Sequence, residues 1–277
     1  MAGMGTYVVS DIHGCYSQLQ QALELAGFCD TDQLYVLGDI IDRGPQIGEC
    51  IEWLVRARAN DKDSNVRFLM GNHEEMATWA FCGRWSRFDF DDINLAPWEI
   101  NGGTKTIEQM RALDPTTVDA FQRIVERAPH AVTAAAGSAS QAATPAAGEN
   151  GERVLLCHAG IRPAEPEAEE GEWLIQSDED LLWIGNEWYC AEEQPPFHVV
   201  SGHTPTFALA SKRALPGCTD QAYTNGLEWR MMHWGRKHDI DCGCVYGGNL
   251  GLLRLDDWQE FYVPAEQTMG PDDDRLR

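Results

Sequence analysis

Short apolar runs alternate with amphipathic stretches through the first half of the chain. The runs are rich in β-branched and aromatic residues and predict strands at residues 6–9, 34–37 and 66–70. In the stretches that follow them, apolar residues recur with the spacing of one helical face. These stretches predict helices at residues 17–26, 47–55 and about 75–81. The alternation of strand and helix predicts an α/β fold.

The second half of the chain carries further strand signals. Two apolar runs, at 154–157 and 198–201, resemble the earlier strands. The region from Gln221 to Tyr262 is β-rich and ends in a predicted hairpin, with strands at 250–255 and 259–263. We expect this last region to form a second sheet.

Five of the predicted strands end in polar clusters that contain histidine or a carboxylate. The clusters are Ser10-Asp11-Ile12-His13-Gly14, Gly38-Asp39-Ile40-Ile41-Asp42-Arg43-Gly44, Gly71-Asn72-His73-Glu74, His158-Ala159-Gly160 and Gly202-His203-Thr204. Ligands of open α/β sheets bind at the carboxyl ends of the strands, where loops from several strands meet. The pattern therefore predicts one site built from all five clusters.

The side chains in these clusters favour a metal centre. Carboxylate, amide and imidazole groups together suit Mn²⁺, Fe or Zn²⁺ better than Ca²⁺. A single histidine is more often a hydrogen-bonded core or surface residue than a metal ligand. Histidines that occur together with carboxylates at several strand ends are instead expected to bind metal. Buried groups of this kind would be unpaired without metal, so we expect two ions that share one carboxylate, with Asp39 as the bridge. The predicted ligands are Asp11, His13, Asp39, Asn72, His158 and His203.

Composition narrows the possible partners. The 21 basic and 44 acidic residues give a formal charge of -23, which argues against binding to nucleic acid or to anionic membranes. No stretch approaches the ~20 apolar residues of a membrane helix, and the N-terminus lacks the features of a secretory signal, so we expect a cytoplasmic protein. Nine scattered cysteines favour reduced thiols, and the spacing of Cys242 and Cys244 is too short for a zinc ribbon.

The chain is predicted to form a single domain over residues 1–270. An Ala/Gly/Ser-rich segment at about 134–152 offers little to bury and is interpreted as a flexible insertion, and 271–277 as a disordered tail. Eight acids between Glu165 and Asp180 indicate a solvated surface segment.

The ordered series SDIHG, GDIIDRG, GNHE, HAG and GHT resembles the phosphoprotein phosphatase family of metallophosphoesterases. Within this family the chain resembles small bacterial and bacteriophage serine/threonine phosphatases in further stretches. They share His13-Gly14-Cys15-Tyr16, a stretch like Asn101-Gly102-Gly103, and a strand like the one that begins at Asp241.

The resemblance implies a four-layer sandwich, in which two mixed β-sheets are flanked by helices. By family position, Asp11 and His13 bind one metal, Asn72, His158 and His203 bind the other, and Asp39 binds both. A hydroxide that bridges the metals attacks phosphorus directly. His73 is similar to the general acid of the family, Asp42 orients it, and Arg43 binds phosphate oxygens.

This sequence departs from the family at three places. Ser10 replaces a glycine, which changes only backbone freedom, and cysteines 242 and 244 stand in a family strand, where packing is the simpler interpretation. More important, relatives place a second phosphate-binding arginine near Gly185, and this chain has none there. Arg162 either takes that role or forms a salt bridge with the nearby acidic run.

The leading functional prediction is a metal-dependent phosphomonoesterase, a hydrolase acting on phosphoserine or phosphothreonine in proteins or peptides. Its two metals are expected to be manganese, with Fe or Zn as alternatives, and the resemblance suggests a monomer. The alternative is hydrolysis of dinucleotide polyphosphates or other small phosphate esters, which the charge of -23 disfavours. A non-catalytic metal-binding scaffold is a third reading, but the presence of His73, Asp42 and Arg43 argues against it.

Overall fold

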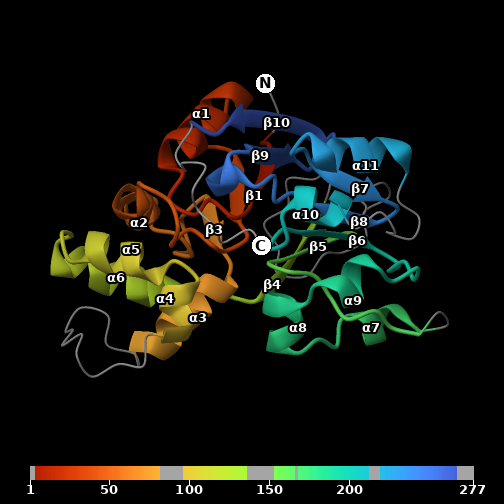
Figure 1. Ribbon diagram of the computed structural model, residues 1–277, viewed down its shortest axis with the longest axis horizontal. Helices are drawn as coiled ribbons and strands as arrows, with labels where there is room; N and C mark the ends of the chain where they lie inside the picture. The colour runs from red at the N-terminus through yellow and green to blue at the C-terminus, as the bar shows by residue number, and fades with distance from the viewer. Residues whose placement is uncertain (1–3, 82–95, 136–152, 166–167, 212–218, 267–277) are drawn as a thin grey trace.

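Two five-stranded mixed sheets face each other, and helices cover both outer faces (Figure 1). The computed structural model describes residues 4–81, 96–135, 153–165, 168–211 and 219–266. The α/β class and the four-layer sandwich predicted from the sequence are confirmed. None of the helices within these ranges is long and apolar enough to cross a membrane.

The first sheet has the strand order β10-β9-β1-β2-β3. Its strands are β1 (Thr6–Val9), β2 (Gln33–Val36), β3 (Val66–Phe68), β9 (Asn249–Arg254) and β10 (Gln259–Pro264). β1, β2 and β3 run parallel, whereas β9 pairs antiparallel with β1 and β10 antiparallel with β9. The C-terminal hairpin therefore completes the first sheet. The expectation that the region from Gln221 to Tyr262 forms a second sheet is therefore wrong for its hairpin, although residues 232–234 and 237–239 of that region do belong to the second sheet.

The second sheet has the order β4-β5-β6-β8-β7. Its strands are β4 (Ala131–Ala135), β5 (Arg153–Cys157), β6 (His198–Ser201), β7 (Met232–Trp234) and β8 (Lys237–Asp239). β5, β6 and β8 are parallel, and β4 and β7 are antiparallel edges. The predicted insertion overlaps β4 at its first two residues, and the rest of it, like the tail 271–277, lies outside the described residues.

Helices α1 to α6 cover the first sheet, and α7 to α11 cover the second (Figure 1). The first group is α1 (Tyr16–Ala26), α2 (Ile47–Arg56), α3 (Asn72–Phe81), α4 (Ala96–Ile100), α5 (Gly103–Met110) and α6 (Pro115–Glu126). The second is α7 (Glu170–Trp173), α8 (Asp178–Trp183), α9 (Asn186–Tyr189), α10 (Thr206–Ser211) and α11 (Asp220–Leu227). The acidic run predicted as surface thus includes two short helices.

Alternating side chains of the central strands fill three apolar layers. Tyr7 and Val9 of β1 pack toward the helices of the first sheet, while Val8 between them packs between the sheets. In β5, Leu156 also lies between the sheets, and Leu155 packs under the helices of the second sheet. The period of two along each strand therefore produces the sandwich.

The carboxyl ends of β2 and β3 touch each other through glycine. A Cβ on Gly38, which has φ +86°, would lie 2.4 Å from Cα of Gly71. The buried carboxylate of Glu74 accepts the backbone N–H groups of Asp39 at 2.8 Å and Ile40 at 3.0 Å, which attaches the loop after β2 to the first turn of α3. The position of Asp39 is thus fixed by the contact between the two glycines and by the side chain of Glu74.

Replacing Gly38 by alanine is expected to lower the free energy of unfolding by about 3 kcal/mol, because the left-handed backbone and the clash with Gly71 both add a cost. Gly27 is the matched control, since its φ is +66° and nothing lies within 4 Å of a Cβ placed there. Gly27→Ala should cost only about 1 kcal/mol. Urea unfolding of both variants measures the difference, and equal losses would contradict the proposed contact.

Candidate metal centre

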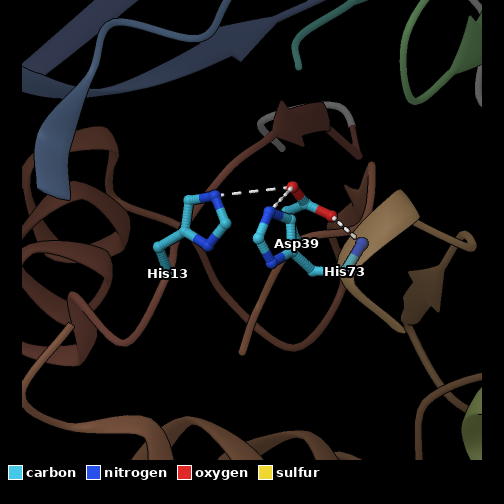
Figure 2. Close-up of side chains that lie close together, drawn as sticks. All are labelled: His13, Asp39 and His73. Carbon is cyan, nitrogen blue, oxygen red and sulfur yellow. Dashed lines mark hydrogen bonds and ion pairs between the residues drawn. The ribbon is translucent and has the colours of Figure 1, made fainter. Parts of the chain in front are cut away.

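The six side chains predicted as ligands meet where the carboxyl ends of the two sheets lie side by side. Two groups of three residues each bring their donor atoms within 4.8 Å of one another, and Asp39 belongs to both groups. One group is His13, Asp39 and His73, and the other is Asp11, Asp39 and His158. Figure 2 shows a ring nitrogen of His13 and one of His73 facing the same carboxylate oxygen of Asp39. Its place in both groups suits a bridging ligand.

Backbone carbonyls orient two of the histidines. His13 Nδ1 lies 2.7 Å from the carbonyl oxygen of Ile41, which turns Nε2 toward Asp39 Oδ2 at 3.4 Å. His158 Nδ1 lies 2.8 Å from the carbonyl oxygen of Leu37, and its Nε2 is 3.6 Å from Asp39 Oδ1. Histidines that bind metals commonly donate their other N–H in this way.

Asn72 joins the histidines from the second sheet. Its Oδ1 lies 2.8 Å from His158 Nε2 and 3.2 Å from His203 Nδ1. Across the gap between the sheets, Asp11 Oδ2 accepts the backbone N–H of His203 at 2.9 Å and the hydroxyl of Ser10. All six predicted ligands are therefore brought together.

The electrostatics of the centre fit divalent cations. Burial raises the pKa of Asp39 well above its usual value, and the neighbouring carboxylate of Asp11 adds to this effect. Burial also lowers the pKa of His13 and of His203, which keeps their rings neutral and able to donate lone pairs. Carboxylates and neutral imidazoles gathered away from water are the donor set that two divalent ions would satisfy.

His73 and Asp42 form a buried pair beside the candidate ligands. His73 Nδ1 lies 2.5 Å from Asp42 Oδ2, and His73 Nε2 faces Asp39 Oδ2 at 3.7 Å. Burial raises the pKa of Asp42 to about 8 and lowers that of His73. Trp98 Nε1 donates to Asp42 at 2.7 Å, and the hydroxyl of Thr106 also donates to it. The imidazole is thus held with one nitrogen toward the centre, as a general acid requires.

The two arginines predicted to bind phosphate differ in position. The guanidinium of Arg43 contacts His13 Nε2 and lies 5.6 Å from the centre of the Tyr246 ring, so it is at the metal centre. Arg162 is 61% exposed and donates to Asp180 at 2.5 Å. The structure therefore shows the salt bridge that the sequence offered as one of two alternatives for Arg162. Phosphate binding by Arg162 stays a prediction.

Two further carboxylates of the centre were not predicted. Asp241 is buried, and its pKa is raised by burial and by Asp11. Glu74 holds the loop of Asp39, as described above. Both stand in motifs named above, the segment that begins at Asp241 and the GNHE cluster. The strand expected from Asp241 onward is wrong, because this segment follows β8 as a turn with a short 3-10 helix at Cys244–Tyr246. No sequence spacing shows that one side chain faces the centre and the other faces backbone.

Cys242 and Cys244 behave as core residues. Both side chains are about 2% exposed and belong to apolar layers. Burial raises the pKa of the Cys242 thiol. Their packing agrees with the simpler interpretation from the sequence.

Comparison with known proteins finds a matching family model, relatives of similar length and a solved structure with the same fold. Residues 4–248 match the family model of the calcineurin-like phosphoesterases. A symmetrical bis(5'-nucleosyl)-tetraphosphatase of Erwinia tasmaniensis is 26% identical, over 95% of this chain and 98% of the relative. One from Salmonella paratyphi B is 27% identical over 96% of each chain. A solved structure provisionally named as a diadenosine tetraphosphatase shares the fold, with TM-score 0.57, 18% identity and 95% of each chain covered.

His73→Asn is expected to retain metal binding but to lower kcat by about 10²–10⁴ for substrates with a basic leaving group, because the predicted proton donor is lost. The loss should be larger for phenyl phosphate than for p-nitrophenyl phosphate, whose leaving group needs less protonation. Steady-state kinetics with both esters, together with metal content, measures this. An equal loss for both esters would remove His73 from the role of acid.

Proposed function

Because the chain belongs to the calcineurin-like phosphoesterase family, we propose that it is a metal-dependent hydrolase of dinucleoside polyphosphates. The supporting observation is that relatives matching almost its whole length are named symmetrical bis(5'-nucleosyl)-tetraphosphatases. This was the alternative in the sequence-based prediction. The main prediction, hydrolysis of phosphoserine or phosphothreonine in proteins, becomes the second candidate.

The geometry supports phosphoryl chemistry of this type. Asp11, His13, Asp39, Asn72, His158 and His203 would hold two divalent ions. When bound, such ions supply activated water at neutral pH and neutralise charge on phosphoryl oxygens. Arg43 binds an oxygen of the scissile phosphate with its planar guanidinium. His73 delivers a proton from Nε2 to the departing oxygen, while Asp42 holds Nδ1.

A second cation beside Arg43 favours a substrate with several phosphates. The ammonium of the exposed Lys105 donates to the carbonyl oxygen of Arg43 at 2.7 Å. The ammonium of Lys105 is thus attached to the backbone of the residue whose guanidinium lies at the centre. A phosphomonoester presents one phosphate to Arg43, whereas a tetraphosphate extends farther and can contact Lys105 as well.

The test uses metal-stripped protein with and without Mn²⁺, diadenosine tetraphosphate and a phosphothreonine peptide. We expect Mn²⁺-dependent conversion of the dinucleotide to two molecules of ADP, measured by ion-exchange chromatography. Products of ATP and AMP would contradict symmetrical cleavage. Release of phosphate from the peptide with no cleavage of the dinucleotide would favour the second candidate and reject the first.

Lys105→Ala is expected to raise the KM for diadenosine tetraphosphate about fivefold and to leave the KM for p-nitrophenyl phosphate unchanged, since one exposed charge contact contributes up to about 1 kcal/mol. Lys62→Ala is the matched control, because this exposed lysine precedes β3 at the end opposite Asn72. Equal effects of Lys105→Ala on both substrates would contradict the extended phosphate contact.

A further inference from the structure

A phenol that takes no part in the proposed chemistry bridges the two histidine loops of the second sheet. The hydroxyl of Tyr189 lies 2.7 Å from the carbonyl oxygen of Gly202 and 3.2 Å from that of Ala159. These residues are the immediate neighbours of the candidate ligands His203 and His158. The backbone N–H of Gly202 also donates to the carbonyl oxygen of His158 at 2.8 Å. The two loops are therefore joined through the phenol and through their own backbone.

Tyr189 is itself held firmly. Its side chain is fully buried, and its ring packs against Trp234 with centroids 5.7 Å apart. The buried ammonium of Lys237 on β8 donates to the carbonyl oxygens of Trp188 at 2.9 Å and Ala191 at 2.7 Å, on either side of Tyr189 in the chain. The strand thus anchors α9, and α9 presents the phenol to the loops.

Trp188, the residue before Tyr189, also packs against the loop that carries His158. Gly160 has φ +142°, and a Cβ there would lie 2.4 Å from the indole of Trp188. The indole therefore packs directly on the backbone two residues after the candidate ligand. The short helix α9 contacts both histidine loops, with Trp188 on one and Tyr189 on both.

The consequence is seen at Asn72, where the rings of His158 and His203 converge on one oxygen atom at 2.8 and 3.2 Å. A shift of about 1 Å in either loop would separate these donors. Removing a group that orients a metal ligand typically lowers metal affinity or activity by about 10–100-fold. We propose that Tyr189 is a positioning residue that sets the spacing of His158 and His203 for the second metal ion. This inference rests on the proposed metal-dependent function.

The test is Mn²⁺ binding by equilibrium dialysis, without substrate, to the full-length protein and to Tyr189→Phe. We expect two Mn²⁺ ions per wild-type chain. In the variant, one ion should bind about tenfold more weakly, while the thermal midpoint falls by only about 2–4 °C. Activity should return toward the wild-type kcat at saturating Mn²⁺, because the ligands themselves are intact.

Tyr7→Phe is the matched control. Tyr7 is also buried, and its hydroxyl donates to the carbonyl oxygen of Ala26 at the end of α1, away from the centre. This variant should retain both Mn²⁺ affinities. In a His203→Ala background, where the second ion is already weakened, adding Tyr189→Phe should leave the affinity of the remaining ion unchanged.

The outcomes separate this inference from the proposed function. Unchanged affinities in Tyr189→Phe, or equal losses in Tyr189→Phe and Tyr7→Phe, would overturn the positioning role. A wild-type chain that binds fewer than two Mn²⁺ ions would overturn it as well, together with the metal centre. Weaker Mn²⁺ binding in Tyr189→Phe with no cleavage of the dinucleotide would support the positioning role and reject the substrate.

Discussion

The candidate site depends on left-handed backbone at residues that are not glycine. Among the described residues, ten non-glycine residues have positive φ, and six of these belong to the site: Asp11, His13, Asp39, Asp42, Arg43 and His203. Each such conformation costs about 1 kcal/mol or more, so the six together approach the whole stability of a typical domain. Backbone contacts between the loops offset this cost, since His13 N–H donates to the carbonyl oxygen of Asp39 at 2.8 Å and Gly14 N–H to that of Ile40 at 3.1 Å.

These turns direct side chains from two separate sheets toward one point. Asp11, His13, Asp39 and Asn72 follow strands of the first sheet, whereas His158 and His203 follow strands of the second. Two bonds described above join the sets through backbone: His203 N–H donates to Asp11, and His158 Nδ1 lies 2.8 Å from the carbonyl oxygen of Leu37. Both lie at the centre itself, and the apolar layer between the sheets, which includes Val8, Leu156 and Val200, holds the sheets together behind it. Packing in that layer and geometry at the centre are coupled, because a sandwich whose sheets slip would separate the two sets of donors.

The sequence predicted the strands and helices near the motifs well, because each has a clear local period followed by a polar cluster. It did not predict α4, α5 and α6, although Asp114 caps α6 and Pro115 begins it, a recognisable start signal. The place of the C-terminal hairpin beside β1 depends on pairing between residues about 245 positions apart, which no local pattern encodes. At the site, the donor types and their order indicated the ligands. Trp98 and Thr106, which hold Asp42, come from helices far along the chain and are visible only once the fold brings them together.

Net charge argues little for or against a polyanionic substrate, for a physical reason. The formal charge of -23 sums over the whole surface, but exposed charges farther apart than about 8 Å are largely screened at physiological ionic strength. Part of the acidic excess lies in the run that includes Asp180, which is already paired with Arg162. The potential that a substrate meets is set instead by groups close to Asp39: the buried carboxylates, the divalent ions that they would hold, and Arg43. A polyanionic substrate is therefore compatible with an acidic protein, and the choice between a single phosphate and a phosphate chain depends on the residues around the centre.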